Sequence, residues 1–146
     1  VNELRLFMNN HSKKGRILII DDEPDVVFYL KTLLEDHGYI TVTANDASSG
    51  FSIAKKECPD LICLDIMMPK KSGVTLYKEL KEDEKLKNIP IIIISGVESA
   101  YSFRGPKFRM LIPDTRIPEP AAFFEKPINI SAFTDFIAKI FNCSEK

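Results

Sequence analysis

Residues 17–26 read ILIIDDEPDV and contain the pattern from which the fold is inferred. The four aliphatic residues at the start form a short, unbroken run, which is typical of a strand buried on both faces of a parallel sheet. The run ends in two aspartates, Asp21 and Asp22, and Pro24 follows where the first residue of a helix would stand. The segment therefore predicts a strand, an acidic turn and a helix in close succession.

The same alternation continues along the chain. Apolar residues recur at helical spacing after Pro24 until Gly38. Further strands are expected at residues 40–44, 61–64, 91–94 and about 121–124, and further helices at about 47–57, around 74–80 and around 133–141. Five alternations of strand and helix indicate an α/β fold with a doubly wound, five-stranded parallel sheet covered by helices on both faces.

Composition excludes several classes of protein. The chain has 146 residues, the size of one domain, and its 45% hydrophobic and 28% charged residues exclude disordered, collagen-like and coiled-coil proteins. A net charge of −1 provides no general field for binding nucleic acid or anionic lipid. The longest aliphatic run, residues 91–94, is too short to span a bilayer. Three cysteines without C-x-x-C spacing favour a reduced, intracellular setting.

Polar side chains stand where the expected strands end. They are Asp21 and Asp22 after the first strand, Asp65 after the third, Ser95 after the fourth and Lys126 after the fifth. The carboxyl ends of parallel strands lie at one edge of an open sheet, where ligands bind. Carboxylates so close together repel one another, which favours a bound Mg²⁺. A carboxylate there can attack phosphorus, and Lys126 and Ser95 can bind phosphoryl oxygens.

Each of these residues taken alone also has a purely structural explanation. Asp21 and Asp22 can stabilise the N-terminus of the following helix, and Asp65 can cap a turn. Ser95 can simply begin a loop, and most lysines, like Lys126, are solvated. All of them at the same sheet edge favour a functional site.

The segments ILIIDDEPDV, LICLDIMMPKKSG, PIIIISG and FFEKP, in this order and at strand ends, resemble those of a receiver domain of a two-component response regulator. The resemblance extends from Arg16 to Phe141. It implies a CheY-like, flavodoxin-like sheet with strand order 2-1-3-4-5. It also implies a receiver domain over residues 16–142, with an N-terminal tail or linker at 1–15 and a C-terminal tail at 143–146.

The resemblance further implies the roles of the site residues. Asp65 would be the phosphoacceptor. Asp22, Asp21 and Asp65 would bind Mg²⁺ together with the backbone carbonyl of Met67, Asp21 mainly through water. Met67 and Val97 occupy the positions from which polar side chains orient water in other receivers, so the phosphorylated form is expected to be long-lived.

Four further positions match the family's pattern, and two of them, Ser95 and Phe123, would form its switch. Ser95 would turn toward the phosphoryl group, and Lys126 would pair with it. Phe123 falls on the aromatic switch position, although its ring lacks the hydroxyl that a tyrosine would offer. Pro127 matches a proline that is usually preceded by a cis peptide bond.

The partners implied are a histidine kinase or phosphotransfer protein as phosphoryl donor and a downstream effector domain or protein. No helix-turn-helix or zinc-finger pattern is present, so direct nucleic-acid binding is not expected. Membrane binding is not expected either, because the longest aliphatic run is too short to span a bilayer. A cytoplasmic location is therefore expected. The chain is interpreted as a signalling module, not an enzyme. Two alternatives stay open: a small Mg²⁺-dependent phosphatase or phosphotransferase with an aspartate nucleophile, and an interaction module independent of phosphorylation.

One departure from the family lies between Ser95 and Lys126, which are 31 positions apart, more than is typical. Four prolines crowd this stretch: Pro106, Pro113, Pro118 and Pro120. They predict an irregular segment and leave only residues 98–103 for the fourth helix. That prediction weighs against dimerisation through this helix, and the basic residues of the segment are interpreted as a solvated loop.

Overall fold

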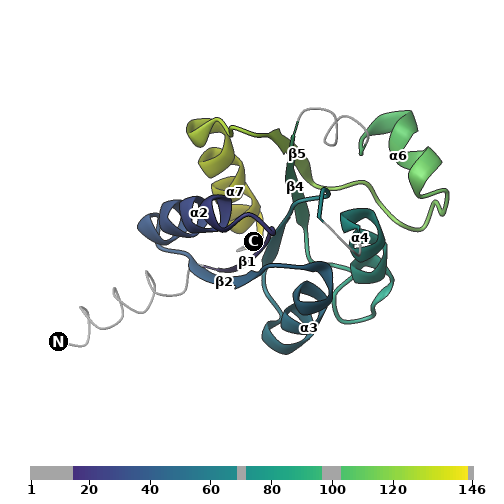
Figure 1. The fold of residues 1–146 in the computed structure, drawn as a ribbon, viewed down its shortest axis with the longest axis horizontal. Coiled ribbons are helices and arrows are strands. Elements are labelled where there is room, and N and C mark those ends of the chain that lie inside the picture. Colours follow the sequence, from purple (N-terminus) through teal and green to yellow (C-terminus); the bar gives the residue numbers. More distant parts are fainter. Residues whose placement is uncertain (1–14, 69–71, 97–102, 145–146) are drawn as a thin grey trace.

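The computed structural model describes residues 15–68, 72–96 and 103–144. These residues form a central sheet with helices on both faces (Figure 1). The sheet has five parallel strands in the order β2-β1-β3-β4-β5, which confirms the predicted topology. No helix of the described part is both long and apolar enough to cross a membrane.

The elements alternate along the chain as expected. The strands are β1 (Arg16–Ile20), β2 (Ile40–Ala44), β3 (Leu61–Leu64), β4 (Ile91–Ser95) and β5 (Ala122–Glu125). The helices are α2 (Pro24–Asp36), α3 (Ala47–Glu57), α4 (Gly73–Glu82), α6 (Gly105–Leu111) and α7 (Ile130–Ser144). Strand β5 therefore begins one residue later than predicted and extends to Glu125.

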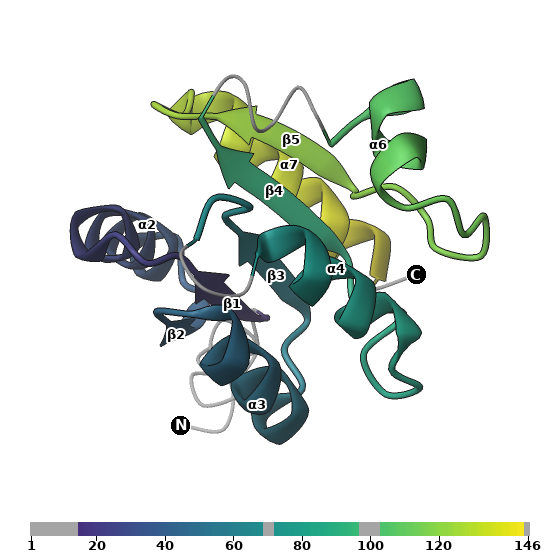
Figure 2. The same cartoon turned by 45° about the vertical axis from the view of Figure 1, so that its right-hand side comes forward.

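The core has two layers, one on each face of the sheet. Helices α2 and α7 pack on one face, and α3, α4 and α6 pack on the other (Figures 1 and 2). Strands β1, β3 and β4 lie between the layers, which explains their continuous apolar sequences. Cys63 of β3 is buried in the α2–α7 layer, and burial raises the pKa of its thiol to about 12.

Local sequence determines where three helices begin. Pro24 stands at the start of α2, where its missing N–H leaves no intrahelical hydrogen bond unmade. The Asp46 side chain caps α3 by accepting a hydrogen bond from the backbone N–H of Ser49 at 2.7 Å. Ser72 caps α4 in the same way. These caps start each helix directly after a strand-end loop.

The proline-rich stretch was predicted to be irregular, and this prediction is wrong for residues 105–111, which form helix α6. Pro106 lies in the first turn of that helix, where proline is tolerated. The other three prolines lie beyond its end, so they exclude a long helix but not a short one. Of the residues 98–103 expected to form the fourth helix, only Phe103 is described, and it lies in a turn before α6.

Residues 103–120, here named the cap segment, fold back on the core. Phe103 and Phe108 are fully buried, and their rings pack edge to face with that of Tyr77 of α4. The Tyr77 hydroxyl donates a hydrogen bond of 2.6 Å to the carbonyl of Pro118. The cap segment is therefore an ordered part of the domain that lies beside β4 and β5 (Figure 2).

Candidate functional site

The sheet brings the polar strand ends together. The backbone N–H of Asp65 donates to the carbonyl of Ile20, and that of Lys126 donates to the carbonyl of Ser95. Asp65 and Lys126 thus continue the hydrogen-bond ladder by one step beyond β3 and β5, as expected for parallel strands that end at a common edge. The residues that sequence analysis placed on four separate segments lie at one end of the sheet.

Asp65 is held from several sides. Its Oδ1 accepts hydrogen bonds from the Ser95 hydroxyl at 2.8 Å and from the Met67 backbone N–H at 3.1 Å, and its Oδ2 accepts one from Lys126 Nζ at 3.3 Å. The side chain is buried, with the residue only 3% exposed, and Ser95 is wholly buried. Gly73 packs directly against the backbone at Asp65, where a Cβ would lie 2.7 Å from the Asp65 carbonyl oxygen.

Lys126 bridges three carboxylates. Besides Asp65, its Nζ donates to Asp21 Oδ2 at 3.0 Å and to Glu23 Oε1 at 3.2 Å. Burial acts to lower the pKa of the Lys126 ammonium, but the hydrogen bond to Asp21 and the charges of Asp65 and Asp21 outweigh it, so the pKa lies above its ordinary value. The lysine is therefore a permanent cation at neutral pH.

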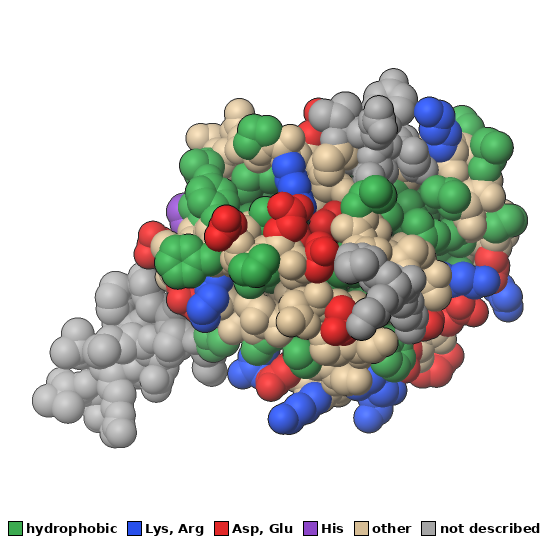
Figure 3. All heavy atoms as spheres, viewed as in Figure 1, with side chains coloured by type: hydrophobic (Ala, Val, Ile, Leu, Met, Phe, Trp, Pro, Cys, Tyr) green, Lys and Arg blue, Asp and Glu red, His purple; other side chains and the backbone are tan. Residues whose placement is uncertain are grey.

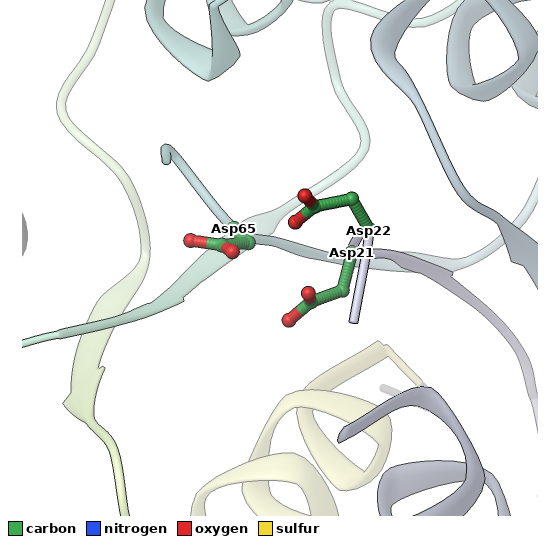
Figure 4. A group of neighbouring side chains, drawn as sticks. All are labelled: Asp21, Asp22 and Asp65. Atoms are coloured by element: carbon green, nitrogen blue, oxygen red, sulfur yellow. The ribbon is translucent and has the colours of Figure 1, made fainter. Parts of the chain in front are cut away.

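Three aspartates form an acidic cluster. One carboxylate oxygen each from Asp21, Asp22 and Asp65 lies within 4.8 Å of the others. Figure 4 shows the Asp21 and Asp22 side chains extending toward the side on which Asp65 lies. Burial raises the pKa of the Asp21 carboxyl and the charge of Asp65 adds to this, although hydrogen bonds from Glu23 and Lys126 act in the opposite direction. The cluster is a set of hard oxygen ligands of the kind that Mg²⁺ binds.

A groove lies beside the charged site. Figure 3 shows acidic side chains gathered near the middle of this face, with a basic side chain beside them. A groove of about 500 Å³ opens next to Lys126, between α2 and the residues that follow β5. Its lining is mostly apolar and includes Val26, Tyr29 and Ile128. The site therefore combines a charged centre with an apolar surface at its side.

Comparison with known proteins identifies the family. Residues 17–105 match the response regulator receiver domain. The chain belongs to this family. As a receiver domain of the response-regulator type, it has a fold and a strand-end site consistent with a phosphoacceptor role in two-component signalling.

Individual relatives agree with this assignment, and solved structures share the fold. PilH of Pseudomonas aeruginosa is 36% identical over 81 residues, which cover 56% of this chain and 67% of PilH. The polar-differentiation response regulator DivK of Brucella ovis is 30% identical over 121 residues, covering 83% of this chain and 91% of DivK. Among solved structures, a receiver domain protein from Clostridium thermocellum has a TM-score of 0.74 at 24% identity, covering 90% of this chain and 98% of that one. The chemotaxis protein CheY4 of Vibrio cholerae has a TM-score of 0.71 at 21% identity, over 86% of this chain and 98% of CheY4.

The receiver fold brings five predicted residues together: Asp21, Asp22, Asp65, Ser95 and Lys126. Two others lie at the margin. The Met67 side chain is 67% exposed, and its backbone N–H contacts Asp65. Phe123 is half-buried on β5, and the guanidinium of Arg104 lies over its ring at 4.9 Å from the centroid. Val97 lies outside the described residues.

Two features of this receiver were missed in the sequence. Glu23 is a third carboxylate on Lys126, and its backbone N–H donates to Asp21 Oδ1 at 2.9 Å. Its place directly after the two aspartates and before Pro24 was a usable signal. The contact of Arg104 with Phe123 joins the segment expected to be irregular to the expected strand 19 positions later, and no local pattern marks it. The cis peptide bond expected before Pro127 is confirmed.

Proposed function

We propose that this receiver accepts a phosphoryl group on Asp65 from the phosphohistidine of a histidine kinase or phosphotransfer protein. The observation that supports this most directly is the arrangement of the Asp65 carboxylate. One of its oxygens accepts from a neutral hydroxyl, Ser95, and the other from a fixed cation, Lys126. Both donors suit the oxygens of a phosphoryl group bound to Asp65.

The transfer is a simple displacement at phosphorus. An Asp65 carboxylate oxygen forms a bond to phosphorus while the P–N bond of the phosphohistidine breaks, and the electron pair of that bond stays on the imidazole nitrogen. Lys126 and Ser95 then bind the phosphoryl oxygens. Because the pKa of Lys126 is raised, its positive charge is present throughout the reaction.

The residues present fit a Mg²⁺ ion as cofactor. Asp21, Asp22 and Asp65 would hold it, with the Met67 backbone carbonyl as a further ligand. Two of the three carboxylates are almost fully buried and lie close to like charges, an arrangement that a divalent cation would stabilise. When bound, the ion supplies positive charge that neutralises the phosphoryl oxygens.

The output of the receiver is a change of conformation. Ser95 would follow the phosphoryl group, and Phe123 would respond on the neighbouring strand. The groove beside Lys126 offers the phosphoryl donor an apolar contact next to the reacting carboxylate. We place the receiver at residues 16–142 and expect it to work in the cytoplasm as a signalling module that controls an effector without catalytic turnover.

The test uses acetyl phosphate, and separately beryllofluoride, each with Mg²⁺. We expect one phosphoryl group per wild-type chain by intact-protein mass spectrometry, one site for beryllofluoride, and neither with Asp65→Asn. Asp135→Asn, which changes an exposed aspartate of α7, is the matched control and should react like the wild type. Stoichiometric phosphorylation of Asp65→Asn would show that the assignment is wrong. Continuous release of phosphate faster than the Asp65 phosphate itself decays would instead indicate an enzyme, and no reaction at all a phosphorylation-independent module.

A further inference from the structure

Glu23 lies between the reacting centre and the groove. Its Oε1 accepts a hydrogen bond from Lys126 Nζ at 3.2 Å, and the same Nζ donates to Asp65 Oδ2 at 3.3 Å. Glu23 also lines the groove that opens beside Lys126. Its side chain is 60% exposed, whereas Asp65 is buried. A phosphoryl donor that reaches Asp65 from this groove therefore passes the Glu23 carboxylate.

The Glu23 side chain does not cap its own helix. Glu23 is the N-cap residue of α2, yet only its backbone contributes to the start of the helix. The Glu23 carbonyl accepts a hydrogen bond from the Val27 N–H at 3.1 Å, and the Glu23 N–H donates to Asp21 Oδ1 at 2.9 Å. A change of the side chain leaves these backbone contacts in place, so the charge of Glu23 can be removed without disturbing the start of α2.

The leaving group of the donor would face the side on which Glu23 lies. The attacking and leaving atoms stand roughly in line in phosphoryl transfer. Asp65, the attacking group, is only 3% exposed, so the leaving group lies outward of phosphorus, toward the solvent. Glu23 is the exposed carboxylate on Lys126, and a single ammonium group separates it from the reacting carboxylate.

Two classes of donor differ in the charge of this leaving group. In nitrogen-linked donors, such as phosphohistidine, the departing nitrogen group is protonated before transfer. The bond from Asp65 to phosphorus forms, the P–N bond breaks, and the electron pair stays on nitrogen, which leaves as a neutral amine or imidazole with its N–H. In an acyl phosphate a P–O bond breaks instead, and the leaving group is a carboxylate anion, which only accepts hydrogen bonds.

A carboxylate beside the leaving group distinguishes these classes. Glu23 attracts the positively charged nitrogen group before transfer and accepts a hydrogen bond from its N–H as it departs. It repels the carboxylate that departs from an acyl phosphate. Lys126 does not make this distinction, because its ammonium binds phosphoryl oxygens, which both classes of donor have.

We infer that Glu23 is a specificity-determining residue that favours nitrogen-linked phosphoryl donors over acyl phosphates. This inference rests on the proposed function of Asp65. The Glu23 carboxylate acts on the leaving group, whereas the three aspartates of the cluster act on the metal ion and the phosphoryl group. Its negative charge therefore favours transfer from a phosphohistidine over transfer from small acyl phosphates.

The test compares two small donors with Mg²⁺ at neutral pH: phosphoramidate, a zwitterion with a protonated nitrogen, and acetyl phosphate. The initial rate of Asp65 phosphorylation is measured with each donor by intact-protein mass spectrometry. Effects of a substitution on folding, on Mg²⁺ or on Lys126 are common to both donors and cancel in the ratio of the two rates. In Glu23→Gln the ratio of the phosphoramidate rate to the acetyl phosphate rate should fall roughly three- to fivefold, the size of one exposed charge interaction.

Two further variants and salt serve as controls. Glu23→Asp keeps the charge, so its ratio should lie closer to that of the wild type than the ratio of Glu23→Gln does. Glu35→Gln is the matched control, because Glu35 pairs with Lys31 at 2.7 Å near the opposite end of α2, about 18 Å from Glu23, and its ratio should equal that of the wild type. Added salt should reduce the difference between the wild type and Glu23→Gln.

The outcomes separate this inference from the proposed function. If both donors phosphorylate the wild type and Glu23→Gln in the same ratio, the role of Glu23 is overturned alone. It is also overturned if Glu35→Gln changes the ratio as much as Glu23→Gln does. If neither donor phosphorylates the wild type, the proposed function of Asp65 is overturned and the role of Glu23 with it.

Discussion

Replacing Asp22 by asparagine should stabilise the metal-free receiver. Asp21 and Asp65 both accept hydrogen bonds from Lys126, whereas no hydrogen bond to the Asp22 side chain occurs among the residues that the structure describes. Asp22 therefore contributes charge to the cluster without such compensation. The asparagine side chain has nearly the same shape, so the substitution removes the charge and leaves the packing in place.

The size of the effect follows from the geometry. Ligand oxygens of the three aspartates lie within 4.8 Å of one another. At that separation two unit charges repel by about 0.9 kcal/mol in bulk water and by about 3.5 kcal/mol at an effective dielectric constant of about 20. Asp22 is only half-buried and Lys126 lies nearby, so we expect a gain of about 1 kcal/mol, which raises the melting temperature of a domain of this size by about 3 °C.

The assay is thermal unfolding followed by far-UV circular dichroism, since the chain has no tryptophan. In EDTA the variant should melt above the wild type. Saturating Mg²⁺ should reverse the order, because an ion at a hundred times its Kd stabilises the wild type by about 2.7 kcal/mol and the variant by less. Asp135→Asn removes a distant negative charge and should change neither melting temperature by more than about 1 °C. The reasoning would be refuted if the variant melted below the wild type in EDTA. It would also be refuted if Mg²⁺ raised the melting temperatures of the two proteins equally.

Three further predictions concern other groups. Lys126→Met should lower the free energy of unfolding in EDTA by about 2 to 3 kcal/mol, because buried Asp21 loses its cation, and Mg²⁺ should restore part of the loss; urea unfolding with and without the ion checks this. Burial lowers the pKa of Lys81 to about 8, so between pH 8 and 10.5 the unfolded chain binds more protons there than the folded one, and stability due to this group rises with pH. The gain from pH 7 to 9 should be less than about 1 kcal/mol after solvent screening, and absent in Lys81→Met; equal pH profiles would contradict it. Met67→Asn should shorten the half-life of Asp65 phosphate roughly tenfold, the effect of one hydrogen bond of about 1.4 kcal/mol that orients water, and unchanged decay of radiolabelled phosphate would contradict this.

The site can be predicted from the sequence because polar residues stand where the apolar runs of the strands stop. Strands β1, β3 and β4 are buried on both faces. The polar residues that follow their apolar runs, Asp21, Asp65 and Ser95, therefore mark the sheet edge without ambiguity. Lys126 follows the same rule after β5, although that strand is less buried and its start was predicted one residue early. A boundary is well predicted where burial changes abruptly and less well where it changes gradually.

The cap segment escaped prediction for a different reason. Its helix is stabilised by tertiary contacts of Phe103 and Phe108 with Tyr77, and a seven-residue helix has little stability of its own. The prolines therefore predict an irregular segment, although the packing of these aromatic rings stabilises a short helix there. The ion pair of Glu23 with Lys126 likewise depends on the arrangement of two loops 103 positions apart.

The buried thiol of Cys63 provides a probe of the strand that carries the site. Cys63 lies two residues before Asp65, is 2% exposed and pairs in register with Ile19 and Ile92. A thiol reagent reaches it only when β3 separates from its neighbours, whereas exposed Cys58 reacts at once and serves as an internal reference. In a Cys143→Ser background, the ratio of the two labelling rates measures the free energy of opening at the centre of the sheet. A ligand that binds Asp65 only in the folded state should slow the labelling of Cys63 and leave that of Cys58 unchanged.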